Sequence, residues 1–290
     1  MKTNTTYANL TKILQRPIPL QTVAHDRKAG YRRYSLLTNH SRNKEPLVDI
    51  AGYGIAGQSY YSRPNNAAGA LTEVRPAVYV RQDIARRLAD INHALAVSET
   101  VTKLFGGRVE LYVQEGLRSR STQALLYNEV FPRLIRDQQP HMTEQEVLAR
   151  RDQLIAAPQP ADSPSPHATG AAVDVTLRYA DSDLGYKPKQ IVDMGHARIS
   201  DHTASPDFYE QTDKKLSAAE KTARQHRRAF YWIMRGALSP AGDSGLVCNP
   251  TEWWHWSYGD QMWAALTEAP FAFYGAAEQE PSPEVPGKSA

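Results

Sequence analysis

Two stretches of the chain carry side chains that could bind a metal ion. Residues 165–174 read Ser-Pro-His-Ala-Thr-Gly-Ala-Ala-Val-Asp, and residues 252–256 read Glu-Trp-Trp-His-Trp. Imidazole nitrogens and carboxylate oxygens are good zinc ligands, so His167, Asp174 and His255 could supply three ligands and leave a fourth position open, as catalytic zinc sites do. For residues 165–174 alone, a hydrogen-bonded His–Asp pair that closes a turn explains the pattern equally well.

Glu252 adds an acid–base group to this set. It lies in an apolar run with three tryptophans, where a carboxylate needs a partner; the alternative is an aromatic core patch with a hydrogen-bonded histidine. Beside a metal-activated water, whose pKa falls to about 7, a carboxylate can take a proton and pass it to a leaving amine. In a straight strand Glu252 and His255 face opposite sides, so the hypothesis requires a distorted strand, which Pro250 just upstream favours. The combination predicts a metal-dependent hydrolase.

Two other chemistries would use some of the same residues. Two histidines and a carboxylate also form the facial triad of non-haem iron oxygenases. Those enzymes usually hold the histidine and carboxylate two residues apart, and here no Lys or Arg follows His255 before Lys288 to bind an oxoacid cosubstrate. Cys248 could act as a nucleophile with His255, but Asp174 and Glu252 would then have no role. The metal-dependent hydrolase is the better interpretation.

Hydrophobic periodicity indicates the elements that position these side chains. Two-residue alternation predicts strands at 109–114, 172–177 and 252–258, with a weaker one at 47–50. In the second of these the aliphatic face is buried and Asp174 points away between small neighbours. Helical spacing predicts helices at about 82–97, after Ser121 with a bend at Pro132, at 144–156 with Thr143 and Glu146 as a capping box, and at 217–236.

These elements predict an α+β fold with a central, mostly antiparallel sheet flanked by helices, because helices and strands do not alternate regularly. We expect a single domain over residues 1–274, with a core at about 47–258, a helical insertion at about 131–165 and a disordered tail at 275–290. The Pro- and Ser-rich segment 158–166 and the polar segment 181–215 predict loops, and long loops usually cover a site.

The composition limits the function classes. The chain has 290 residues, of which 41% are hydrophobic and 22% charged, as in globular proteins. A net charge of +3 is too small to indicate a nucleic-acid or anionic-membrane partner. Cys248 is the only cysteine, which excludes an intrachain disulfide and favours a reducing compartment. Without a secretory signal or an apolar run of ~20 residues, we expect a soluble cytoplasmic protein, whose oligomeric state the sequence leaves open.

The two metal-ligand stretches together resemble the signature of the D-alanyl-D-alanine dipeptidases, the vancomycin-resistance type of zinc DD-peptidase. Residues 115–118, Glu-Gly-Leu-Arg, resemble the Asp-Gly-Tyr-Arg turn of that family, and residues 193–195, Asp-Met-Gly, resemble its Asp-Met-Gly element. The similarity runs with gaps from about residue 47 to 258. It implies a small α+β fold, one zinc ion per chain and hydrolysis of D-alanyl-D-alanine or a similar D,D-dipeptide.

The resemblance also implies a role for each matched side chain. His167, Asp174 and His255 would be the zinc ligands, Glu252 the general base, and Arg118 the cation that stabilises the oxyanion on the scissile carbonyl. The alternatives are a zinc DD-peptidase acting on longer cell-wall peptides and a non-catalytic zinc-binding interaction protein.

Recognition of the substrate termini is where the chain departs from the family pattern. Ser165 matches a position that the family places near the substrate termini. The acidic residue expected soon after Met-Gly is displaced, and Asp201 is the nearest candidate to bind the substrate ammonium. Leu117 and Ser119 replace the tyrosine and proline that flank the matched arginine.

Overall fold

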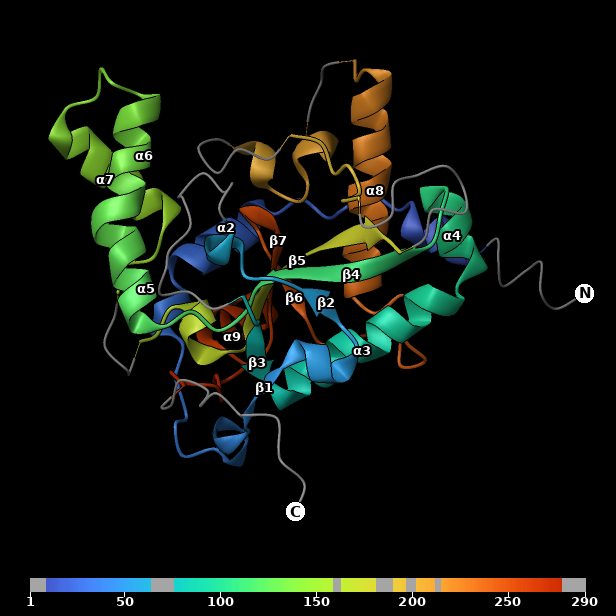
Figure 1. Cartoon of the computed structure of the whole chain (residues 1–290), viewed down its shortest axis with the longest axis horizontal. Helices are drawn as coiled ribbons and strands as arrows, with labels where there is room; N and C mark the ends of the chain where they lie inside the picture. The colour runs from blue at the N-terminus through green and yellow to red at the C-terminus, as the bar shows by residue number, and fades with distance from the viewer. Residues whose placement is uncertain are drawn as a thin grey trace, which may run out of the picture.

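A five-stranded sheet runs through the middle of the molecule (Figure 1). The computed structural model describes residues 9–63, 76–158, 163–180, 190–196, 202–211 and 215–277. The strand order is β2-β4-β5-β7-β6, and all pairs except the parallel pair β2–β4 are antiparallel. The strands are β2 (Ala56–Gly57), β4 (Val109–Glu115), β5 (Ala172–Tyr179), β6 (Val247–Asn249) and β7 (Glu252–Ser257). A separate antiparallel ribbon pairs β1 (Leu47–Asp49) with β3 (Tyr79–Arg81). The predicted α+β fold with a mostly antiparallel sheet is confirmed.

Helices surround this sheet, and three of them follow the predicted bounds closely. The predicted helix 82–97 is α3 (Gln82–Val97). The helix expected at 144–156 is α7 (Glu144–Leu154), and both bonds of its capping box are present. The helix expected at 217–236 is α8 (Ala218–Met234). Shorter helices that the sequence analysis did not predict are α2 (Thr22–Ala29), α4 (Glu99–Phe105) and α9 (Gln261–Thr267).

The helix predicted after Ser121 is divided in two. It consists of α5 (Arg120–Leu125), a π-helical turn (Leu126–Val130) and α6 (Phe131–Gln138). Pro132 lies in the first turn of α6. Because proline lacks an N–H and its ring clashes with the carbonyl four residues earlier, the helical hydrogen-bond pattern widens just before it. The distortion therefore lies upstream of the proline.

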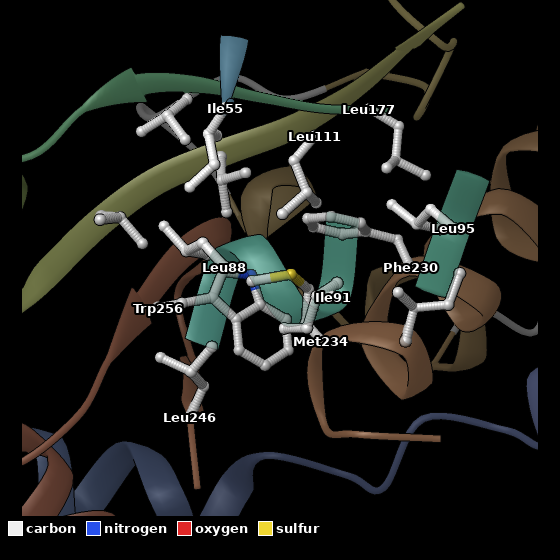
Figure 2. Close-up of a cluster of buried hydrophobic side chains, with 14 of the residues drawn as sticks. Ile55, Leu88, Ile91, Leu95, Leu111, Leu177, Phe230, Met234, Leu246 and Trp256 are labelled. Atoms are coloured by element: carbon white, nitrogen blue, oxygen red, sulfur yellow. The ribbon is translucent and has the colours of Figure 1, made fainter. Parts of the chain in front are cut away.

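The hydrophobic core fills one face of the sheet. Figure 2 shows Leu111 and Leu177 of β4 and β5 facing the apolar side chains of α3 and α8. The fully buried members of this cluster include Ile84, Leu88, Leu95, Phe230, Met234 and Trp256. Asp174 lies between Val173 and Val175, so the strand turns its carboxylate to the opposite face of the sheet. That face is available for a polar site.

The helices α5, α6 and α7 form a lobe at one side of the molecule (Figure 1). A second apolar cluster holds this lobe together, built on Tyr61, Leu126, Val130 and Ile155.

Residues 159–162, which belong to the predicted insertion, lie outside the described residues, as do 278–290 of the predicted tail and most of the predicted loop 181–215. Across the described parts of the chain, the structure contains no helix long and apolar enough to cross a lipid bilayer.

Candidate active site

Three elements bring the predicted metal ligands to one place. His167 lies in a short 3-10 helix, Pro166–Thr169, which ends at Gly170 in the left-handed region with φ of 69°. This φ strains any residue with a Cβ atom, and a Cβ on Gly170 would also lie 2.6 Å from the Leu47 side chain, so the reversal into β5 favours glycine. Asp174 of β5 is directly opposite His255 of β7 in the strand register. The turn at Gly170 therefore places His167 beside the strand that carries Asp174.

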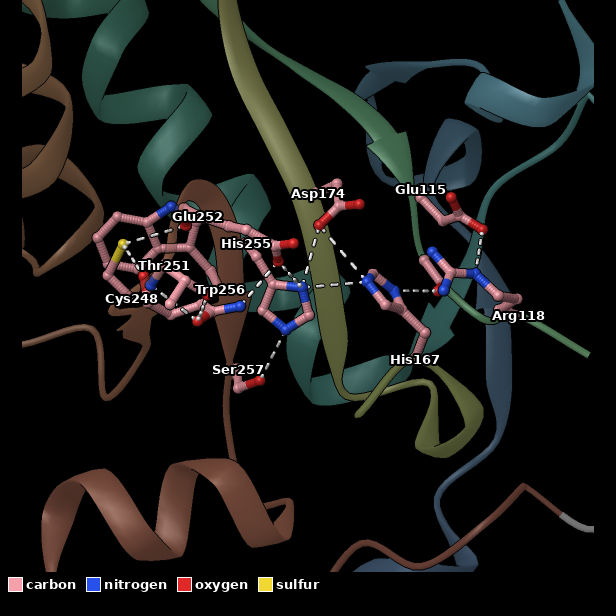
Figure 3. A network of polar contacts seen from close by, with 12 residues as sticks. Glu115, Arg118, His167, Asp174, Cys248, Thr251, Glu252, His255, Trp256 and Ser257 are labelled. Carbon is pink, nitrogen blue, oxygen red and sulfur yellow. Dashed lines mark hydrogen bonds and ion pairs between the residues drawn. The ribbon is translucent and has the colours of Figure 1, made fainter. Parts of the chain in front are cut away.

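The ligand atoms of these residues lie within 4.8 Å of one another. Figure 3 shows the three side chains pointing toward a common centre. His255 Nδ1 is 3.1 Å from both Asp174 Oδ1 and His167 Nε2, and His167 Nε2 is 3.4 Å from Asp174 Oδ1. Asp174 Oδ1 is buried and has no hydrogen bond of acceptable geometry among the described residues. Two imidazoles around such an oxygen fit a metal ion, and this set of donors suits zinc with an open coordination position.

The surroundings fix the protonation of these groups. His167 Nδ1 lies 2.9 Å from the Gly116 carbonyl, to which it donates, so Nε2 is the ring nitrogen that faces the cluster. Burial alone would raise the pKa of the Asp174 carboxyl, but His167 and His255 outweigh burial and hold that pKa well below its usual value. Asp174 is therefore a carboxylate, the form that binds metal.

Glu252 reaches the same centre because β7 is distorted where it begins. The register between β6 and β7 shifts so that Cys248 pairs with Trp256 whereas Asn249 pairs with Glu252. Glu252 Oε2 lies 3.7 Å from His255 Nδ1 and accepts a hydrogen bond of 2.7 Å from Asn249 Nδ2. The predicted distortion of this strand is confirmed, and it brings Glu252 beside the three possible ligands.

Arg118 lies on the opposite side of the cluster from Glu252 (Figure 3). Its guanidinium donates to Glu115 Oε1 at 3.0 Å and to Gln123 Oε1 at 2.9 Å, and it stacks over the Tyr61 ring. Burial alone would lower the pKa of Arg118, but the Glu115 carboxylate outweighs burial and the pKa is raised. Arg118 is thus a fixed cation at the site, whereas the neighbouring Arg120 is exposed.

One cavity of about 460 Å³ is lined by the three possible metal ligands, Glu252 and Arg118. Its volume lies in the range of small-molecule sites, roughly 300–1,000 Å³. The wall also includes buried Ser165, the end of the α5–α7 lobe at Asp152 and Leu154, and the N-terminal residues Lys28 and Arg32. Asp201, the candidate for binding a substrate ammonium, lies outside the described residues.

The model of the D-Ala-D-Ala dipeptidase family, a group of M15 metallopeptidases, matches residues 48–273. The chain belongs to this family. A D-alanyl-D-alanine dipeptidase of Synechocystis sp. is 30% identical over 230 residues, which cover 76% of this chain and 84% of that protein. The resemblance stated from the two motifs is confirmed. Membership in a metallopeptidase family also favours the hydrolase over the oxygenase and over a non-catalytic binding protein.

Cys248 is not placed to act as the nucleophile of this dipeptidase-family site. Its side chain is buried, and its sulfur lies 3.6–3.8 Å from the carbonyls of Asn249, Glu252 and Trp253. Burial raises the pKa of the thiol well above its usual value, so little thiolate forms at neutral pH. The thiol therefore belongs to the core.

Several groups that shape the site had no role in the sequence analysis. Glu115 and Gln123 hold Arg118, and Asn249 holds Glu252. Glu115 had a signal, since it precedes Arg118 by three residues at a strand end. Gln123 had none, because its contact depends on the angle at which α5 leaves the sheet. Lys28 in α2 and Arg32 in the following 3-10 helix also line the cavity, but they precede the family match.

Proposed function

We propose that the protein is a zinc-dependent dipeptidase that hydrolyses D-alanyl-D-alanine or a similar D,D-dipeptide. The main support is the meeting of three possible metal ligands with a carboxylate and a buried cation in one cavity. The family and the Synechocystis relative support the same substrate class. The rest of the proposal concerns what each side chain does.

His167, Asp174 and His255 would hold the zinc ion. The buried Asp174 oxygen without a hydrogen bond and the two imidazole nitrogens near it are the observations that fit an ion. Zinc at this position would polarise the scissile carbonyl and lower the pKa of a water molecule. The Gly116 carbonyl keeps the His167 ring in the orientation that such binding needs.

Glu252 would act as the general base and then as the general acid. Its carboxylate would accept a proton from the attacking water and deliver it to the leaving amine. The 3.7 Å distance from Glu252 Oε2 to His255 Nδ1 supports this role, because a water beside the ligand set would be within reach. The hydrogen bond from Asn249 would keep the carboxylate turned toward the cluster.

Arg118 would stabilise the negative charge that develops on the carbonyl oxygen. A cation fixed in a buried site is most effective when it needs no reorganisation during the reaction. Glu115 and Gln123 provide that fixation, and they engage Nε and Nη1 of the guanidinium. Ser165, in the cavity wall, and Asp201 would contact the charged substrate termini.

The decisive experiment is a hydrolysis panel of D,D- and L,L-dipeptides and blocked analogues, with and without a chelator. For Glu252→Gln we expect zinc to stay bound and hydrolysis of D-alanyl-D-alanine to fall at least about 100-fold. Glu129→Gln, an exposed glutamate outside the cavity, is the matched control and should retain full activity. Turnover retained by Glu252→Gln, or unaffected by the chelator, would contradict the proposal.

A zinc DD-peptidase acting on longer cell-wall peptides is the second candidate. The cavity volume supports this candidate, because about 460 Å³ is more space than two alanine residues occupy. The blocked analogues in the panel separate the two functions. A dipeptidase requires free termini, whereas the alternative enzyme would cleave the extended substrate at a similar rate.

A further inference from the structure

The hydrogen bond that holds Glu252 is the last of three that follow one another. Asn249 Nδ2 donates to Glu252 Oε2 at 2.7 Å, and Asn249 Oδ1 accepts from Thr251 Oγ1 at 2.9 Å. The Thr251 hydroxyl accepts in turn from the ammonium of Lys28. A continuous hydrogen-bond path therefore leads from a lysine to the carboxylate that is proposed as the general base.

The lysine at the start of this path precedes the family match. Lys28 lies in the last turn of α2, and the match begins at residue 48. Helix α2 packs against α9, to which the ion pair between Arg27 and Glu268 also ties it at 2.9 Å. This packing brings Lys28 to Thr251, a residue 223 positions further along the chain. The path therefore depends on how the N-terminal segment docks beside the site.

The chemistry of the side chains gives the path one direction. An ammonium has donors and no acceptor, so Thr251 Oγ1 accepts from Lys28, and its single hydroxyl hydrogen goes to Asn249 Oδ1. Asn249 Oδ1 also accepts from the Thr251 backbone N–H at 3.1 Å. Because the oxygen of the Asn249 amide is turned to Thr251, its NH₂ group is left to donate to Glu252. The ammonium thus sets which way each polar group faces.

Lys28 also acts on Glu252 through its charge. Burial lowers the pKa of Lys28, and the Glu252 carboxylate opposes that shift, so the two groups attract each other. Thr251 and Glu252 lie on the side of the ligand set away from Arg118 (Figure 3). Lys28 lines the cavity together with Glu252. A direct contact of Lys28 with the substrate is therefore the alternative that an experiment must separate.

We propose that Lys28 is a positioning residue for Glu252, and that it holds the carboxylate toward the attacking water through Thr251 and Asn249. Without the ammonium the Thr251 hydroxyl is free to rotate, and the Asn249 amide is held by the Thr251 backbone N–H alone. A general base must lie within hydrogen-bond reach of the proton it takes, and a misplacement of 1 Å costs up to about 100-fold in rate. This assignment rests on the proposed function, in which Glu252 is the general base.

The test is a double-mutant cycle on the zinc-loaded full-length protein. Lys28→Met and Thr251→Val each interrupt the path, and we expect each to lower kcat for D-alanyl-D-alanine about tenfold, with KM and zinc content near the wild-type values. Because both substitutions break the same path, the double variant should lose little more than either single variant. Losses that multiply would overturn the assignment. An unchanged kcat in either single variant would overturn it as well, and a change confined to KM would place Lys28 on the substrate instead.

Two further variants separate the path from the docking of α2. Arg27→Met is the matched control, because Arg27 is the neighbouring cation of the same helix and contacts Glu268 and the Leu266 carbonyl instead. It should retain full activity, and a loss equal to that of Lys28→Met would overturn the assignment. Thr251→Ser keeps the hydroxyl and should recover most of the kcat that Thr251→Val loses; no recovery would exclude the hydroxyl from the path. The two Thr251 variants leave α2 unchanged, so they decide the question even if Lys28→Met does not fold.

Unfolding in urea is a readout that does not depend on hydrolysis. The stability losses of Lys28→Met and Thr251→Val should be less than additive, because either change breaks the same hydrogen bond. Additive losses would overturn the path itself. If the losses are less than additive but the unmodified protein cleaves no D,D-dipeptide, the proposed function fails and the path stands. If D-alanyl-D-alanine is cleaved and the losses in kcat multiply, the positioning role fails alone.

Discussion

Two side chains hold Arg118 in position: one lies three residues before it in the chain and the other five residues after it. Glu115 and Gln123 bind separate nitrogens of its guanidinium, and the Tyr61 ring covers one face. A lysine has a single ammonium and cannot keep both contacts while facing the cluster. The site therefore depends on the shape of the arginine as well as on its charge.

We predict that Arg118→Lys lowers kcat for D-alanyl-D-alanine about 100-fold or more, the cost typical of losing an oxyanion donor. Zinc content should stay at the wild-type level, because Arg118 is not a ligand. Steady-state kinetics and metal analysis check this. The exposed Arg120→Lys is the control; a similar loss in that variant would show that the change acts on the fold of α5.

Cys248 gives a second prediction at this scale. Because the thiol is buried and its pKa is raised by burial, iodoacetamide at neutral pH should neither modify the native protein nor inhibit it. Intact-protein mass measurement before and after denaturation with guanidinium checks this. Alkylation should appear only in the denatured sample, and rapid inactivation of the native enzyme would restore the cysteine mechanism.

Residue types and spacing were enough to name the side chains that meet at the site, but their partners could not be predicted. His167, Asp174 and His255 are the residue types that bind zinc, and the turn at Gly170 is visible in the sequence. Gln123 and Arg32 are ordinary polar residues at helix positions. Their contacts follow from where α5 and the 3-10 helix Tyr31–Arg33 pack, which no local pattern determines.

The ion pairs of the chain differ in how much they stabilise the fold, because the elements that carry them bury them to different extents. Glu115 ends β4, and its pair with Arg118 has side-chain exposures of 5% and 10%. The pair of Arg136 in α6 with Glu144 in α7 has exposures of 48% and 60%. Breaking a buried pair leaves an uncompensated charge in a poorly solvated place, whereas an exposed pair is replaced by water.

We predict that Glu115→Ala lowers the free energy of unfolding by about 3 kcal/mol or more. Glu144→Ala, the control at the exposed pair, should leave the free energy of unfolding nearly unchanged. Urea denaturation of both variants measures the difference. Equal costs would contradict the prediction and would mean that the Arg118 charge does not depend on Glu115 for its stability.

Elements in which the hydrophobic pattern repeats over many residues could be predicted from the sequence, and the short elements could not. The apolar face of α3 and the alternating apolar residues of β4 and β5 extend over enough residues to be recognised in the sequence. Strand β6 has three residues and exists through its pairing with β7, which is a nonlocal contact. The bend at Pro132 was predicted from the proline, but its form, a π-helical turn at Leu126–Val130, was not.

At the scale of the whole molecule, the candidate metal site joins parts of the chain that are far apart in sequence. The possible ligands come from a 3-10 helix, a central strand and a strand some eighty residues later. An ion that binds the folded chain and not the unfolded one raises stability by mass action.

We therefore predict that removing zinc with a chelator lowers Tm and that adding zinc restores it in a concentration-dependent way. At a free zinc concentration of 100 times Kd the gain is about 2.7 kcal/mol. Thermal unfolding followed by circular dichroism measures the shift. In His255→Gln the dependence on zinc should be lost or much reduced; a full response in that variant would place the stabilising ion elsewhere.

The direct pairing of Asp174 with His255 across β5 and β7 has a consequence for refolding. If β7 slipped by one position, every side chain along it would change faces, and a tryptophan would stand where the imidazole belongs. Such a misaligned chain could look folded by its helix content yet have lost a coordinating group. The stoichiometry of tightly held ion after renaturation would then count the molecules whose strands have found their proper alignment.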